Sequence, residues 1–278
     1  MRQILFWIAA IVITLATVIY QKKTGPTYPE KATYTIDNQT RTITLTRSGE
    51  TSIDVEVTID SLPLEWEATL YYRKYPTTTD WITEPLMMNP NGGVTTFLPN
   101  QPAAGKLEYY IEMKNLVTQE TQSIKKDDPV IIRFKGAVPA FALIPHIILM
   151  FIAMLLSNLA GIMAAFMHSR FKFYMLLTII TLFVGGLVFG PIVQHYAFGQ
   201  AWTGWPLGSD LTDNKTLIAF VAWLVALLVN RKEDRPLVVI FAALVTMAVY
   251  LIPHSLRGSE LNHETGEIVT GIITTFMH

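Results

Sequence analysis

One stretch of the sequence decides the fold class: residues 145–167 read PHIILMFIAMLLSNLAGIMAAFM, with no Asp, Glu, Lys or Arg. A helix rises about 1.5 Å per residue, so this stretch is long enough to cross the roughly 30 Å hydrocarbon layer of a bilayer. It therefore predicts a transmembrane helix from about Pro145 to Met167.

Four further apolar stretches predict membrane spans in the same way. One runs from Gln3 to Tyr20, and three follow the first span: Phe173 to Val193, Asp213 to Val229 and Pro236 to Ile252. For the N-terminal stretch a cleavable signal peptide is the alternative interpretation, because one basic residue before an apolar core fits both. No clear small-residue cleavage site precedes Gln21, so we favour a retained anchor.

Residues typical of helix N-termini mark where three of these helices are expected to begin. Pro145 and Pro236 suit the first turn of a helix, where the missing N–H removes no hydrogen bond. Asp213 is suited to cap the span that follows it. The last two spans are short, so we expect them to tilt or to thin the bilayer locally.

Basic residues predict the orientation of the spans. They lie in two of the short loops: Arg170 and Lys172, then Arg231, Lys232 and Arg235. The intervening loop, residues 196–214, has no basic residue. Cytoplasmic loops are enriched in Lys and Arg, so five spans place the N-terminus inside the cell and the middle region outside.

The middle region changes to a period of two, which is typical of half-buried strands. Ile53, Val55, Val57 and Ile59, for example, alternate with polar residues. The expected strands are Thr42–Thr46, Ile53–Ile59, Trp66–Tyr72, Trp81–Leu86, Gly93–Leu98, Leu107–Met113 and Val130–Phe134. About seven short strands separated by turn residues predict a β-sandwich.

Part of this region resembles a known family. The segment from Leu98-Pro99 through Gly105-Lys106-Leu107-Glu108-Tyr109 is similar to the approach to strand F in fibronectin type III and immunoglobulin-like domains. The resemblance implies that the Tyr109 hydroxyl bonds back to the preceding corner, and that the domain binds or spaces rather than catalyses. No nucleophile elbow, phosphate loop or paired-carboxylate motif is present, so we expect no enzyme.

Histidines at the outer ends of the spans form the most informative chemical pattern. His146 begins one span, His195 closes the next and His254 follows the last, while Trp202 and Trp205 lie in the outer loop between them. Neutral imidazoles at equal depth can ligate haem iron from both faces. A haem b site would use His146 and His254, with His195 as a substitute for either.

The order of these elements also resembles the haem-handling core of the cytochrome c assembly proteins that carry a tryptophan-rich (WWD) loop. By that resemblance His146 and His254 correspond to the flanking histidines, and Trp202, Trp205 and Asp210 to the loop. Two alternatives stay open. Aromatic residues gather at membrane interfaces without any ligand, and a metal site would recruit His254, Glu260 and His263, although their spacing matches no zinc-protease motif.

Composition narrows the function classes. The chain has 278 residues, 51% of them hydrophobic and 15% charged, with a net charge of −1 and no cysteine. A near-neutral chain gives no reason to expect nucleic acid as a partner, and the lack of cysteine excludes disulfides, thiolate metal sites and Fe–S clusters. We found no acidic or basic relay within the spans, which disfavours an ion-coupled transporter.

The sequence therefore predicts a membrane α-helical bundle plus an all-β domain in a bacterial inner membrane, with the β domain on the periplasmic side. We expect an anchor (residues 1–23), an Ig-like sandwich (24–136), a four-helix bundle (137–252) and an outer tail (253–278). The predicted function is a non-enzymatic scaffold or complex subunit. Its sandwich and outer loops would contact envelope proteins, with membrane lipid around the helices. The alternative is a haem-binding or haem-handling membrane protein.

Overall fold

The chain divides into two compact units, which we describe separately. A computed structural model describes residues 2–253, 259–263 and 265–269. The helical unit comprises the described residues of Met1–Pro26 and Val138–Ser259, and the β unit comprises Thr27–Ala137 and Glu260–Val269. His254 lies outside the described residues.

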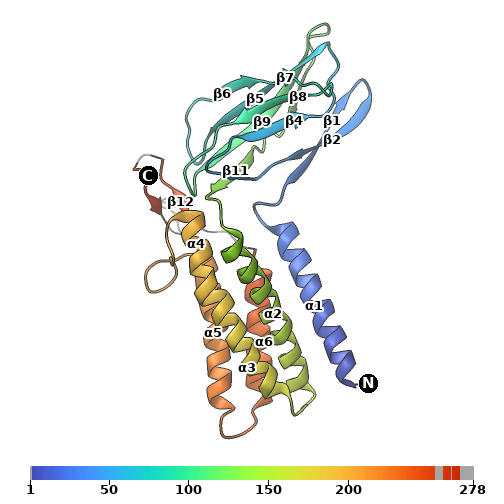
Figure 1. Cartoon of the computed structure of the whole chain (residues 1–278). Coiled ribbons are helices and arrows are strands. Elements are labelled where there is room, and N and C mark those ends of the chain that lie inside the picture. Colours follow the sequence, from blue (N-terminus) through green and yellow to red (C-terminus); the bar gives the residue numbers. More distant parts are fainter. Residues whose placement is uncertain (1, 254–258, 264, 270–278) are drawn as a thin grey trace. The chain divides into compact units, whose positions relative to one another are not determined.

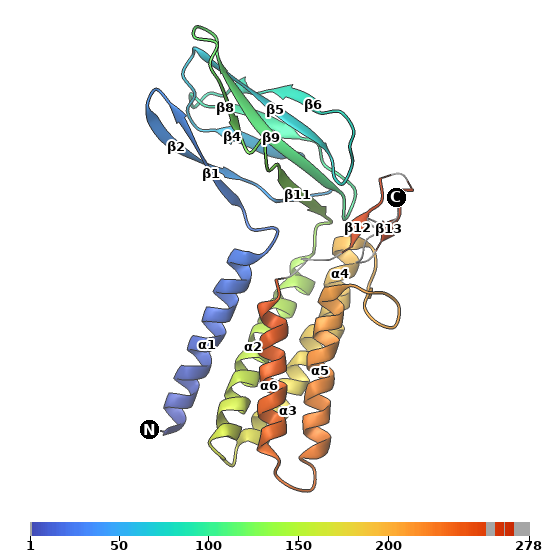
Figure 2. The same cartoon turned by 180° about the vertical axis from the view of Figure 1, so that it is seen from behind.

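The helical unit consists of long apolar helices (Figures 1 and 2). They are α1 (Arg2–Thr24), α2 (Ala140–Ala165), α3 (Phe171–Leu182), the π-helical segment η1 (Phe183–Phe189), α4 (Gly190–Phe198), α5 (Leu211–Val229) and α6 (Pro236–Leu251). By length and composition α1, α2, α5 and the continuous helix Phe171–Phe198 are able to cross a membrane. The fifth predicted span forms α6, which is shorter at 16 residues. The chain is therefore a membrane protein with four helices of spanning length among its described residues.

Helix α1 packs against the other helices and does not stand apart from them. Its buried face consists of Phe6, Ala10, Thr14 and Thr17. The Asn158 side-chain amide on α2 donates a hydrogen bond to the Thr14 hydroxyl oxygen at 3.0 Å, and that hydroxyl donates to the Ala10 carbonyl at 2.7 Å. A polar contact of this kind between apolar helices holds them in one register.

Two of the expected helix starts are wrong. Helix α2 begins at Ala140 after Pro139, so Pro145 lies inside the helix and not in its first turn. Helix α5 is capped by Asp210, whose side chain accepts from the amides of Thr212 and Asp213, so Asp213 is not the cap. Pro236 does occupy the first turn of α6, as expected.

The β unit contains two larger sheets and two hairpins. Its strands are β1 (Glu30–Ile36), β2 (Gln39–Leu45), β3 (Ser48–Glu50), β4 (Val55–Ile59), β5 (Trp66–Lys74), β6 (Ile82–Pro85), β7 (Met87–Met88), β8 (Val94–Leu98), β9 (Lys106–Asn115), β10 (Thr121–Ile124), β11 (Val130–Lys135), β12 (Glu260–Leu261) and β13 (Ile268–Val269). One sheet has the order β3-β11-β9-β5-β6 with β10 also paired to β9, and the other has the order β4-β8-β7. All seven expected strands are present, and β1, β3, β7, β10, β12 and β13 are additional.

Both larger sheets and the β1–β2 hairpin contribute to one hydrophobic core. At its centre the Tyr109 side chain is fully buried, and its hydroxyl donates to the Thr46 carbonyl at 2.9 Å. This partner lies just before β3, whereas the family resemblance implied the corner between Leu98 and Gly105. Burial raises the pKa of Tyr109 well above its ordinary value.

The C-terminal hairpin belongs to the β unit. Strands β12 and β13 pair antiparallel, and the Leu261 amide donates to the Ala104 carbonyl at 3.2 Å. The Lys106 ammonium and the Glu260 carboxylate form an ion pair at 2.7 Å. The segment expected as a separate tail is therefore fastened, in its described part, to the start of β9.

Candidate functional site

His146 is held against the π-helical segment. Its Nδ1 atom lies 2.8 Å from the Gly185 carbonyl oxygen. A carbonyl only accepts hydrogen bonds, so Nδ1 carries the proton and Nε2 presents a lone pair. The Gly190 amide also donates to the Gly185 carbonyl, five residues back, which is the π-helical pattern. Such π segments are frequent at functional sites.

Two glycines allow the neighbouring helices to reach the backbone of this segment. A Cβ atom on Gly185 would lie 2.7 Å from the Leu149 Cβ on α2, and one on Gly186 would lie 2.6 Å from the Thr216 Cγ2 on α5. These distances are shorter than real Cβ contacts. The close approach of α2 is what brings His146 within hydrogen-bonding distance of η1.

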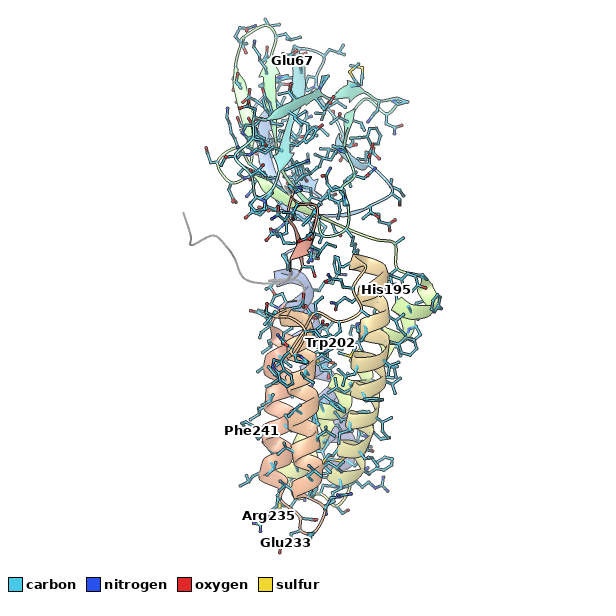
Figure 3. The ribbon with its side chains drawn as sticks, turned by 90° about the vertical axis from the view of Figure 1, so that its left-hand side faces the viewer. Glu67, His195, Trp202, Glu233, Arg235 and Phe241 are labelled. Carbon is cyan, nitrogen blue, oxygen red and sulfur yellow. The ribbon has the colours of Figure 1, made fainter. Side chains whose placement is uncertain are left out.

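The other predicted haem residues lie in different surroundings. His195 is exposed in the last turn of α4, where its ring meets the Tyr196 ring edge-on. Figure 3 shows Trp202 further along the bundle than His195, toward the end that carries Glu233 and Arg235. The Trp202 indole N–H donates to the Trp205 carbonyl at 3.2 Å. Since His254 is outside the described residues, the predicted His146–His254 pair stays a prediction.

Two carboxylates order the junction between the α4–α5 loop and helix α5. Asp210 Oδ1 accepts from the Thr212 amide at 2.7 Å and so caps α5. Asp213 Oδ2 accepts from the amides of Thr203 at 2.7 Å and Gly204 at 3.0 Å. Asp210, expected in a ligand-binding loop, uses its carboxylate as a helix cap, while Asp213, expected as the cap, binds the loop backbone.

Two amide side chains also bind this loop. Gln194 on α4 donates from Nε2 to the Thr203 hydroxyl at 2.5 Å, and Asn214 on α5 accepts from the Trp205 amide at 2.7 Å. We call Gln194, Asp210, Asp213 and Asn214 the loop clamp. It was not predicted from the sequence, although Asp and Asn near a helix start are the residue types that bind free amides.

A buried lysine also lies at this end of the bundle. The Lys215 ammonium donates to the carbonyls of Ile252 at 2.8 Å and Pro253 at 3.4 Å, which follow α6. A cation suits the carbonyl-rich C-terminal end of a helix. Asp213 and Lys215 are both buried in α5, and each binds backbone groups.

The residues proposed for a metal site make other contacts. Glu260 pairs with Lys106, and the His263 Nε2 lies 3.1 Å from the Tyr75 carbonyl. Within the described residues no group of three or more His, Asp or Glu side chains is placed to hold a metal ion.

An exposed apolar surface lies on the β unit, at the end where β5 begins and β9 ends. Leu64, Leu116 and Val117 are 79%, 50% and 80% exposed, and we call them the apolar tip. The Leu116 amide donates to the Glu65 carbonyl at 2.7 Å, so the two loops that carry the tip are joined. Figure 3 shows Glu67, near the start of β5, at this end of the unit.

The tip is held by a short hydrogen-bonded turn. The buried Asn115 accepts from the amides of Val117 at 2.8 Å and Thr118 at 2.9 Å. The Asn115 amide itself donates to the Glu120 carbonyl at 2.8 Å. The tip was not predicted from the sequence, although Leu116 and Val117 are two adjacent apolar residues just after a regular alternation.

No family model, curated protein sequence or solved structure matches the chain.

Proposed function

We propose that this protein is a non-enzymatic subunit of a membrane complex, and that the apolar tip of its β unit binds a partner protein. The observation that carries the proposal is the exposure of Leu64, Leu116 and Val117 on a turn fixed by Asn115. Clusters of exposed apolar side chains mark interaction sites. Because the turn is already ordered, binding would lose little conformational entropy.

We also propose that the β unit is an immunoglobulin-like or fibronectin type III-like sandwich. Its two larger sheets share one core, and consecutive strands cross between them at β3–β4, β4–β5, β6–β7 and β8–β9. Strand β3 pairs parallel with β11. Domains of this architecture commonly bind other proteins through the loops at one end, although the architecture alone does not determine a function.

We also propose an orientation of the protein in the membrane. Lys172, in the first turn of α3, and Asp234, in the loop before α6, form an ion pair at 2.5 Å, which joins the two basic segments at one end of the bundle. Their basic charge favours the cytoplasmic side. If α6 crosses by thinning the bilayer locally, the N-terminus is cytoplasmic and the β unit lies in the periplasm of a bacterial cell.

The test is purification of the full-length protein from native membranes in mild detergent. We expect a partner in fixed stoichiometry, and we expect Val117→Asp and Leu64→Asp to reduce its recovery at least tenfold. Ile53→Asp, an equal charge at an exposed apolar residue before β4, is the matched control and should retain the partner. The proposal is wrong if the charged tip retains the partner or if no stoichiometric partner is recovered.

Haem binding is a second candidate, favoured by one observation. The Gly185 carbonyl holds the proton of His146 on Nδ1 and leaves Nε2 free to ligate iron. We expect a Soret absorption band in the purified protein that His146→Ala abolishes. His168→Ala, in the loop before α3, is the control and should keep the band. A colourless protein, before and after haem is added, would exclude this function.

A further inference from the structure

The loop between α4 and α5 exposes two large apolar side chains. Trp205 is 69% exposed and Leu207 is 78% exposed. Residues 199–209 contain no charged side chain, and Asp210 at the end of the loop is buried as the cap of α5. The loop is therefore uncharged and apolar on its outer side.

The loop lies beside the first turn of α5 and not beyond it. Asp213 and Asn214, both in that turn, bind the amides of Thr203, Gly204 and Trp205. On the other side, Gln194 binds Thr203 from a position four residues before the end of α4. At about 1.5 Å per residue, Thr203 therefore lies about 6 Å from the α4 end, back along the bundle.

Helix length gives the depth at which this loop meets the bilayer. The continuous helix Phe171–Phe198 has 28 residues, or about 42 Å, which exceeds the roughly 30 Å hydrocarbon layer. Its end therefore enters the headgroup layer, and a loop folded back by one turn lies near the boundary with the acyl chains. Indole rings are favoured at this depth.

The backbone of the loop is also suited to a layer that is poor in water. The amides of Leu207 and Gly208 both donate to the Gly204 carbonyl at 2.9 Å. Together with the loop clamp, these bonds satisfy amides that would otherwise need water. Phe141 and Tyr196, two exposed aromatic residues whose rings are in contact, lie near the ends of α2 and α4 on the same side of the membrane.

We propose that Trp205 and Leu207 insert into the lipid interface, so that this loop is a membrane anchor. The occupant of this surface is phospholipid, at the boundary between headgroups and acyl chains. The loop clamp holds the segment that carries Trp205 and Leu207 in a fixed conformation. This proposal does not depend on the role proposed for the apolar tip of the β unit.

The experiment measures tryptophan emission of the full-length protein in phosphatidylcholine vesicles. Lipids carry bromine either near the top of the acyl chains or near their methyl ends, and iodide serves as an aqueous quencher. We expect lipid brominated near the top of the acyl chains to quench the emission of the wild type more strongly than that of Trp205→Phe. With deeply brominated lipid or iodide, the difference in quenching between the two proteins should be smaller. Trp81→Phe, on the β unit, is the control and should leave quenching by brominated lipid unchanged.

A second variant moves the indole within the loop. The double substitution Trp205→Phe, Leu207→Trp should restore quenching by top-brominated lipid, because both positions face the same layer. If the Trp205 emission is quenched by iodide and not by brominated lipid, the loop faces water and the proposal is wrong. If neither quencher reaches it, protein covers the loop and the proposal is equally wrong.

Discussion

Gly185→Ala should destabilise the helical unit by forcing α2 away from the π-helical segment. The new Cβ would lie 2.7 Å from the Leu149 Cβ, about 0.7 Å inside the 3.4 Å at which ordinary contacts begin. The Leu149 Cβ is bonded directly to the α2 backbone, so no side-chain rotation relieves the overlap. Overpacking of this kind costs about 1–3 kcal/mol, while alanine gains about 1 kcal/mol over glycine in a helix.

The two effects partly cancel, so we expect Gly185→Ala to be less stable than the wild type by up to about 2 kcal/mol. Without the overlap, alanine would instead stabilise the helix by about 1 kcal/mol. The assay is unfolding of detergent-solubilised protein by titration with SDS, followed by circular dichroism. A variant that is more stable than the wild type would refute the close packing of α2 on η1.

Three further predictions concern hydrogen bonds. Tyr109→Phe should lower the free energy of unfolding of the β unit by about 0.5–1.5 kcal/mol, because the partly buried Thr46 carbonyl loses this donor. Burial raises the pKa of Tyr109, so wild-type stability should fall as the pH rises above about 10, where the unfolded tyrosine ionises, and fall less in the variant. A double-mutant cycle of Asn158→Leu and Thr14→Val should give a coupling of about 0.6–1.7 kcal/mol in SDS titrations, whereas additive effects would mean that the bond is not formed. Asp213→Ala should speed amide exchange in the α4–α5 loop by about 10–100-fold in hydrogen–deuterium exchange mass spectrometry, and an unchanged rate would contradict the clamp.

The helices and most strands were predictable because each is encoded by its own residues. Uncharged apolar stretches of membrane length mark the helices, and a period of two marks strands with one buried face. Strand β1 was missed, although Ala32, Tyr34 and Ile36 alternate with polar residues along most of its length. The start of α2 was misplaced because proline is also tolerated inside helices that pack in a membrane.

The loop clamp was beyond sequence reasoning for a different reason. From the sequence, the Asp213 carboxylate could equally well accept hydrogen bonds from the first amides of its own helix or from those of a neighbouring loop. Only the folded loop brings the amides of Thr203 and Gly204 to it, while Asp210 takes the cap. The apolar tip was missed likewise, because the exposure of Leu64 and Val117 depends on two loops meeting at one end of the β unit.

The buried ionisable groups of α5 bear on the choice between an enzyme and a binding subunit. Asp213 binds backbone amides of the loop, and Lys215 binds carbonyls after α6, so both charges stabilise the backbone at the ends of helices. A general acid or base must instead reach a substrate proton. Once these contacts are made, the groups that project outward at this end include Trp205 and Leu207, which are suited to lipid. The contacts of α5 therefore favour a structural role for its charged residues, which agrees with the proposal that a partner protein binds at the β unit.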